Sequence, residues 1–226
     1  MADDKSKAIT SPRIALRGRL SFPKLDKAKP FEEGQEPRYE ATSLLDPSDA
    51  KGLESIKLLL TTAANLGKEK WGVVPLAIQK LAAEFVPGTK PVDLNKVKDD
   101  GIELAFYSGT AKADSVETDT YESYRGMLVV PSHQYVSKPK PKIVDRKKNE
   151  VEPGEEGWPY GGCYVVHYIT LWTQTNLKKR IGTNLKGIQF DRDGEAFGAG
   201  AEMAEEDFEA LEDEAAADSG GMDWDT

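Results

Sequence analysis

The last 28 residues of the chain cannot contribute to a folded core. Residues 199–226 contain eleven acidic side chains, no Lys or Arg, and few bulky apolar residues. A segment of this composition buries too little apolar surface to offset the entropy that is lost on ordering, so we expect a disordered tail. The fold must therefore be built from the residues that precede it.

Charge separates this tail from the body of the protein. The whole chain has 30 basic and 39 acidic residues, and without the eleven acids of the tail 28 acidic residues remain against the same 30 basic ones. A mildly basic body tethered to a polyanion indicates nucleic-acid binding, because the tail stays at high local concentration beside any positive groove. We expect the tail to compete with nucleic acid, to recruit partner proteins, or both.

The body has the length of one domain. Residues 13–198 are predicted to form it, whereas residues 1–12 are polar and predicted to be disordered. Cys163 is the only cysteine, which excludes a disulfide framework and a zinc site of the usual multi-cysteine kind. No stretch approaches the ~18 apolar residues of a membrane span, so a cytosolic location is expected.

Alternation of apolar and polar residues predicts the strands. Residues 13–22 follow the period of two that marks a half-buried strand. One face of it holds Ile14, Leu16, Leu20 and Phe22, and the other holds Arg13, Arg17 and Arg19. Further strands are predicted at residues 38–45, 127–130, 134–136, 143–144, 163–173 and 188–190, and loops at residues 24–37 and 176–186.

A helical insertion follows the second predicted strand. Asp46 is expected to cap a helix that has Pro47 at its first position and ends near residue 70. A second helix is predicted at residues 76–85. Strands interrupted by an insertion at about 46–86 favour a mainly β, α+β fold, namely an antiparallel barrel of the oligonucleotide-binding (OB) type.

Basic residues gather in three places. The most basic stretch, residues 138–148, includes Lys138, Lys140, Lys142 and Arg146, and prolines between the lysines keep the chain extended. Lys178, Lys179 and Arg180 form a second cluster, and Arg13, Arg17 and Arg19 form a third. A row of cations can bind along the phosphate backbone of a nucleic acid. The alternative for any one cluster is that it is an ordinary solvent-exposed surface without a ligand.

Aromatic residues accompany these cations. In the predicted strand 163–173, Tyr164, Tyr168 and Trp172 share one face, while the other face, with Cys163 and His167, is expected to be core. Evenly spaced rings can stack on the bases of a single strand, although packing within the protein is the alternative. Tyr124 and Tyr135 flank the basic stretch and are candidates for the same role.

An enzymatic reading has little support. Asp114, Glu117 and Asp119 form an acidic cluster that a metal-dependent nuclease would use, but an exposed acidic loop is far more common. No phosphate-binding loop of the Walker type is present. We therefore expect no catalytic activity, no cofactor and no metal.

Several motifs resemble a known family. The segments YRGMLVV, KPKIVDR, YGGCYV and NLKGIQFDRDGEAFG occur in order between residues 124 and 198. They are similar to a family of phage-encoded single-stranded DNA-binding proteins that have an OB-type barrel and an acidic C-terminal tail. The resemblance implies DNA contacts at Tyr124, Lys142 and Arg146, and a protein that coats single-stranded DNA during replication or recombination in the cytoplasm of the infected bacterial host.

The resemblance also implies a role for the tail. In proteins of this design an acidic tail docks on phage or host replication and recombination proteins, and the docking candidates here are Phe208, Leu211, Asp223, Trp224 and Asp225. Two alternatives remain: a strand-annealing recombination protein, and a protein-interaction module whose tail mimics DNA. The sequence leaves open whether the protein is a monomer or a dimer.

Overall fold

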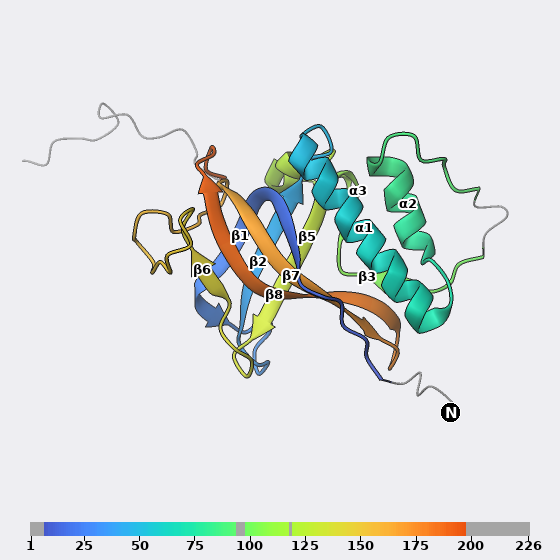
Figure 1. Ribbon diagram of the computed structural model, residues 1–226, viewed down its shortest axis with the longest axis horizontal. Helices are drawn as coiled ribbons and strands as arrows, with labels where there is room; N and C mark the ends of the chain where they lie inside the picture. The colour runs from blue at the N-terminus through green and yellow to red at the C-terminus, as the bar shows by residue number, and fades with distance from the viewer. Residues whose placement is uncertain (1–6, 94–97, 118, 198–226) are drawn as a thin grey trace, which may run out of the picture.

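The computed structural model describes residues 7–93, 98–117 and 119–197 (Figure 1). In chain order the elements are β1 (Ile14–Lys29), β2 (Arg38–Leu45), α1 (Ala50–Trp71), α2 (Leu76–Phe85), β3 (Ile102–Leu104), β4 (Tyr107–Ser108), α3 (Gly109–Asp114), the 3-10 helix η1 (Asp119–Tyr124), β5 (Leu128–Tyr135), β6 (Lys142–Val144), β7 (Tyr164–Gln174) and β8 (Lys179–Arg192).

Five of the strands close into a barrel. β1 pairs with β2 and β7, β2 pairs with β5, and β7 pairs with β8, all antiparallel. The ring closes where β5 meets β8 in parallel, at the pair His133–Asn184. This ring, β1–β2–β5–β8–β7, is an OB-type barrel, so the predicted mainly β, α+β fold is confirmed.

Two groups of apolar side chains stabilise this arrangement. One fills the barrel interior with residues such as Leu20, Val165 and Ile188. The other lies between the barrel and α1, where Ile56 and Leu59 pack with buried residues of β1 and β7. α1 and α2 therefore cover one side of the barrel, and β6 lies on the opposite side (Figure 1).

The predicted helices are present, but the start of the first one is wrong. The side chain of Asp49, not Asp46, accepts the amide of Gly52 at 2.8 Å and caps α1. Asp46 instead accepts two hydrogen bonds from Ser48, so Pro47 lies in the turn before the helix. Both carboxylates lie near a helix start, and spacing alone did not show which one meets the free amides.

Three strands are longer than the sequence predicts. β1 continues to Lys29 through residues predicted as loop, and β5 is one strand that runs through Pro131. The predicted basic loop 176–186 is largely wrong, because β8 begins at Lys179. Gly182 and Gly187 weaken the strand signal there, yet a Cβ at Gly182 would lie 2.3 Å from the Trp172 ring and one at Gly187 would lie 2.7 Å from the carbonyl oxygen of Lys142.

The N-terminal segment is ordered earlier than predicted. Thr10 forms a bridge with Trp172, and the amide of Ser11 donates to the carbonyl of Leu171 at 2.8 Å. The predicted disorder of residues 1–12 is therefore wrong for this part, while residues 1–6 lie outside the described residues. For residues 89–120 the sequence pattern indicates loops and a short strand at residues 102–107, and the structure has the short elements β3, β4 and α3 there.

Candidate nucleic-acid interface

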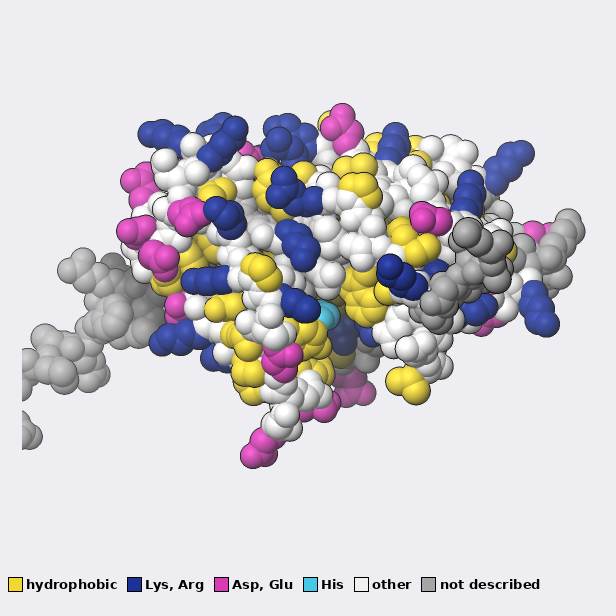
Figure 2. Space-filling view, turned by 60° about the horizontal axis from the view of Figure 1, so that its bottom comes forward, with side chains coloured by type: hydrophobic (Ala, Val, Ile, Leu, Met, Phe, Trp, Pro, Cys, Tyr) yellow, Lys and Arg dark blue, Asp and Glu magenta, His cyan; other side chains and the backbone are white. Residues whose placement is uncertain are grey.

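A cleft of about 740 Å³ lies across β2, β5, the middle of β1 and the ends of β7 and β8. We call it the β2–β5 cleft. Its lining combines aromatic rings (Phe22, Phe31, Tyr107, Tyr121, Tyr124, Tyr135 and Trp172) with the cations Lys24, Arg38 and Arg180, and with Glu40 and His133. Figure 2 shows a hollow that holds a histidine, with hydrophobic side chains on both sides of it and Lys and Arg side chains above it.

An irregularity in β1 places Phe22 in this cleft. The register with β2 shifts between Ser21 and Lys24, and Phe22 adopts a left-handed φ of 44°. Such a bulge changes the phase of alternation, so the prediction that Phe22 faces the core is wrong. Its ring is 54% exposed and lies edge-on to Tyr121, with the ring centroids 6.2 Å apart.

Tyr124 is the buried residue against which the Tyr121 ring packs. Its side chain is only 2% exposed, and its hydroxyl forms a 3.0 Å hydrogen bond with Ser21. Burial raises its pKa to about 12. Tyr121 packs against it with a centroid distance of 5.1 Å, so Tyr124 positions the Tyr121 and Phe22 rings and offers little free face of its own.

Two of the cations in the cleft bind the same carboxylate. Glu40 on β2 forms salt bridges with Lys24 of β1 and with Arg38, the latter at 2.6 Å. Burial raises the pKa of Glu40, but the hydrogen bonds from Lys24 and Arg38 outweigh it and hold the pKa below its usual value. The Arg38 guanidinium also lies 4.7 Å from the centre of the Phe31 ring. The carboxylate thus keeps both cations oriented along the cleft wall.

His133 lies beside these charges on β5. Burial lowers its pKa, and the nearby Arg38 and Arg180 lower it further, while Glu40 opposes them. The ring of Tyr135 is edge-on to His133 at 5.1 Å and is 37% exposed. Tyr135 therefore presents a ring to solvent next to a histidine that titrates below its ordinary range.

Trp172 closes the other end of the cleft. It lies on β7 opposite Gly182 of β8, whose missing side chain leaves room for the indole. Arg180 pairs in register with Gln174 at the same end. The candidates Tyr124, Tyr135, Trp172 and Arg180 therefore meet in the β2–β5 cleft, although they come from separate predicted groups.

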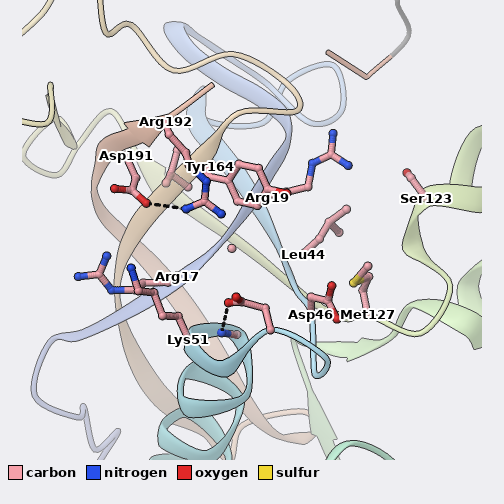
Figure 3. Close-up of a pocket in the computed structure, with 14 residues that line it drawn as sticks. Arg17, Arg19, Leu44, Asp46, Lys51, Ser123, Met127, Tyr164, Asp191 and Arg192 are labelled. Carbon is pink, nitrogen blue, oxygen red and sulfur yellow. Dashed lines mark hydrogen bonds and ion pairs between the residues drawn. The ribbon is translucent and has the colours of Figure 1, made fainter. Parts of the chain in front are cut away.

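A second recess holds three of the other candidates (Figure 3). Arg17 and Arg19 of β1 and Tyr164 of β7 line a space of about 110 Å³ beside the start of α1. The ring of Tyr164 lies between two guanidinium groups, 5.8 Å from Arg19 and 3.8 Å from Arg192. Arg19 also donates to the carbonyls of Gly162 and Glu195. These contacts hold the C-terminal end of the barrel in place and engage both Arg19 and the Tyr164 ring within the protein.

The remaining basic candidates lie outside both recesses. Arg13 and Lys142 line a third recess that also holds Tyr168, and the other exposed candidates are Lys138, Lys140, Arg146, Lys178 and Lys179. Lys178 is paired with Glu103 at 2.7 Å. Tyr164, Tyr168 and Trp172 thus line three separate surfaces, even though alternation places them on one strand face. The tail candidates, Phe208 to Asp225, lie outside the described residues.

Several cleft residues are absent from the sequence-based candidates: Phe22, Lys24, Phe31, Arg38, Tyr107 and His133. Phe31 and Lys24 fall in a stretch predicted as loop, and Arg38 begins a predicted strand without standing in a basic cluster. Loops that join the first two strands of an OB barrel commonly contribute to its ligand site, which is the signal that would have selected Phe31.

The core predictions for the other titratable groups agree with the structure. Cys163 and His167 are fully buried, and burial raises the pKa of the Cys163 thiol to about 11. Within the described part of the chain no group of three His, Cys, Asp or Glu is arranged to hold a metal, and Asp114 is paired with Arg125. No described helix has the length and apolar character needed to cross a membrane.

Comparison with known proteins decides the family. Residues 13–219 match the family described as Enterobacter phage Enc34, ssDNA-binding protein. The chain belongs to this family. The predicted resemblance to phage single-stranded DNA-binding proteins is thereby confirmed, and the match spans the whole barrel.

The individual relatives that follow are distant from this chain in sequence. Protein p50 of Acyrthosiphon pisum secondary endosymbiont phage 1 is 26% identical over 193 residues, which cover 85% of this chain and 90% of that protein. The single-stranded DNA-binding protein of bacteriophage Enc34, solved in complex with ssDNA, matches with a TM-score of 0.57 and 23% identity, covering 82% of this chain and 88% of that one. Its C-terminal truncation gives a TM-score of 0.55 at 24% identity, covering 82% and 87%. At this identity the structural match concerns the fold.

Proposed function

We propose that the protein binds single-stranded DNA in the β2–β5 cleft and that it coats and protects single strands during phage replication or recombination, without catalysis. The observation that carries the proposal is the combination of exposed rings and cations in one cleft, on the face where OB barrels bind oligonucleotides. Family membership supports the same ligand, since the Enc34 protein is described as an ssDNA-binding protein.

The cleft has both parts of a sequence-tolerant binding site. Phe22, Phe31 and Tyr135 are exposed enough to stack on bases, and each stack contributes roughly 1–3 kcal/mol. Lys24, Arg38 and Arg180 are available to phosphates. Lys24 and Arg38 each have further donors besides those that Glu40 accepts, so a phosphate can bind beside the carboxylate. The salt bridges already hold both cations where the DNA backbone would pass.

The test is a fluorescence anisotropy titration with labelled single-stranded and duplex oligonucleotides at several salt concentrations. Three phosphate contacts predict a log–log salt slope of about −2 for a short oligothymidylate. Tyr135→Ala should weaken binding by roughly 1–3 kcal/mol, while Tyr135→Phe, which keeps the ring, should bind like the wild type. A flat salt response together with unchanged binding by Tyr135→Ala would refute the proposal.

We also propose that the acidic tail competes with DNA for the cations of the body and recruits phage or host replication proteins. Deleting residues 199–226 should tighten single-strand binding at low salt, and the gain should shrink as salt screens the charges. Replacing the eleven carboxylates by amides should reproduce this gain. Replacing Phe208, Leu211 and Trp224 by Ala should instead impair capture of a partner polymerase or recombinase and leave DNA affinity unchanged.

Two other outcomes would redirect the proposal. A ring-shaped oligomer in native mass measurements, with accelerated annealing of complementary strands, would favour a strand-annealing protein. A body without its tail that binds no oligonucleotide would favour an interaction module whose tail mimics DNA.

A further inference from the structure

A second basic surface lies outside the β2–β5 cleft. Arg13, Lys142, Lys148 and Lys186 surround a recess of about 240 Å³ with Tyr168 and Gln189, and no Asp or Glu among the described residues lines it. We call this the outer basic recess. It is formed by Arg13, which directly precedes β1, by residues of β6, β7 and β8, and by the turn after β6, and none of its described lining residues also lines the cleft.

Within the described part of the chain, the cations of this recess have only weak partners. Lys142 forms a 2.6 Å salt bridge with Glu150, but both side chains are mostly exposed, and such a pair contributes little stability. A phosphate can therefore replace Glu150. Arg13 lies 5.7 Å from the centre of the Tyr168 ring, whose hydroxyl is fixed by Gln189 at 3.1 Å. The recess thus places cations around a positioned ring, which is the combination that the cleft also has.

A row of lysines connects the two sites. The cleft residue Tyr135 ends β5, and a turn closed by the amide of Lys138 follows it directly. Lys140 lies 6.0 Å from the ring of Tyr39 on β2, and Lys142 begins β6, which pairs with β8 beside Lys186. Prolines 139 and 141 keep the lysines on an extended chain, where alternate residues stand roughly 6 Å apart. Cations therefore continue from the end of the cleft to the outer basic recess.

We propose that a single strand bound in the cleft continues past Tyr135, follows Lys138 and Lys140, and ends with phosphates in the outer basic recess. This inference rests on the proposed function of the cleft and extends it, because it assigns a longer binding site whose second half lies on another side of the barrel. The consequence is that affinity depends on oligonucleotide length in two steps: one for filling the cleft, and a second when the strand reaches Lys142 and Lys186.

The test compares a short oligothymidylate, of about six nucleotides, with one of about 16, both within the range of OB-barrel sites. The full-length wild type, Lys142→Gln/Lys186→Gln and the control Lys57→Gln/Lys80→Gln are titrated at several salt concentrations. The control makes the same charge change at exposed positions on α1 and α2, across the barrel from β6 (Figure 1). The recess variant should bind the short strand like the control. It should bind the long strand several-fold more weakly, with a salt slope reduced by about 1.4 for two lost phosphate contacts.

Other results would overturn the inference. Equal weakening of both lengths would mean a general electrostatic effect, and equal binding of both lengths by the wild type would mean that the site ends at the cleft. Tighter binding by the recess variant would assign the recess to the acidic tail instead. Failure of the proposed function itself is distinguishable, because the wild type would then bind neither length.

Discussion

The buried histidine of the barrel provides a prediction with a calculable size. His167 is fully buried on β7, with Ser43 2.8 Å from Nδ1 and Ser132 2.7 Å from Nε2. The Ser132 hydroxyl donates to the carbonyl of Ala41, so it accepts from Nε2–H, and Ser43 donates to Nδ1. The neutral ring is therefore fully satisfied, and burial lowers its pKa to about 3.

A lowered histidine pKa makes stability depend on pH in a definite direction. The unfolded chain, with an ordinary histidine pKa of about 6.5, binds a proton that the native state refuses between about pH 6.5 and pH 3. The stabilisation from His167 is therefore present above about pH 6.5 and is lost as the pH falls, by at most about 1.4 kcal/mol per pH unit. Between pH 7 and pH 5 the loss comes to about 2 kcal/mol.

Urea unfolding of the wild type and of His167→Gln at pH 7 and pH 5 measures this loss. Gln keeps polar atoms for the serines but does not titrate, so its stability should fall by about 2 kcal/mol less over this interval. Carboxylates contribute equally to both proteins and cancel in the comparison. Equal losses, or an NMR titration in which the His167 ring protonates above pH 5 in the folded protein, would refute the reasoning.

Three further predictions concern the two faces of β7 and the cleft. Ile169→Ala removes a fully buried side chain and should destabilise the protein by about 2–5 kcal/mol in urea unfolding. Tyr168→Ala should cost clearly less because its side chain is only partly buried, and the reverse order would mean that the faces are exchanged. Gly182→Ala should displace the Trp172 indole, which changes tryptophan fluorescence and weakens binding of a short oligonucleotide, and unchanged values for both would contradict the assigned packing. Affinity for single strands should rise as the pH falls from 7.5 to 5.5, because phosphates favour protonated His133, whose pKa is lowered in the free cleft; His133→Gln should remove this dependence.

Alternation predicted the strands whose inner face is continuously apolar. On β7 the residues Val165, His167 and Ile169 are buried as expected, because the period of two is unbroken in its pairing with β1. Alternation did not predict most of β8, because Gly182 and Gly187 lie at positions where a strand pattern needs an apolar or polar side chain. Glycine is required at these positions because the Trp172 ring and the backbone of Lys142 lie too close for a side chain. These are tertiary contacts, which the local sequence does not show.

The candidate site was less predictable than the fold. Tyr164, Tyr168 and Trp172 are spaced evenly, but register shifts between β7 and β8 and the twist of a long strand direct the three rings to different surfaces. Phe22 lies in the cleft because of a bulge beside Pro23, and a proline inside a strand is the one local signal of such a bulge. The combination of aromatic rings and cations in the sequence correctly indicated a nucleic-acid-binding family. Which of these residues share a cleft could not be predicted, because that depends on how the barrel closes.

That closure lies at the floor of the β2–β5 cleft. In the described part of the barrel β5 and β8 share one backbone pair, His133–Asn184, and the hydroxyl of Thr183 adds a 2.6 Å hydrogen bond to the carbonyl of Pro131. Proline offers no amide in return, so these two strands are less firmly joined than the other neighbours in the ring. Amide protons that point across the β5–β8 junction should thus exchange faster than those between β1 and β7. A ligand that contacts Tyr135 of β5 and Arg180 of β8 at the same time would link the two strands across this junction. Its binding should therefore slow amide hydrogen exchange on both strands.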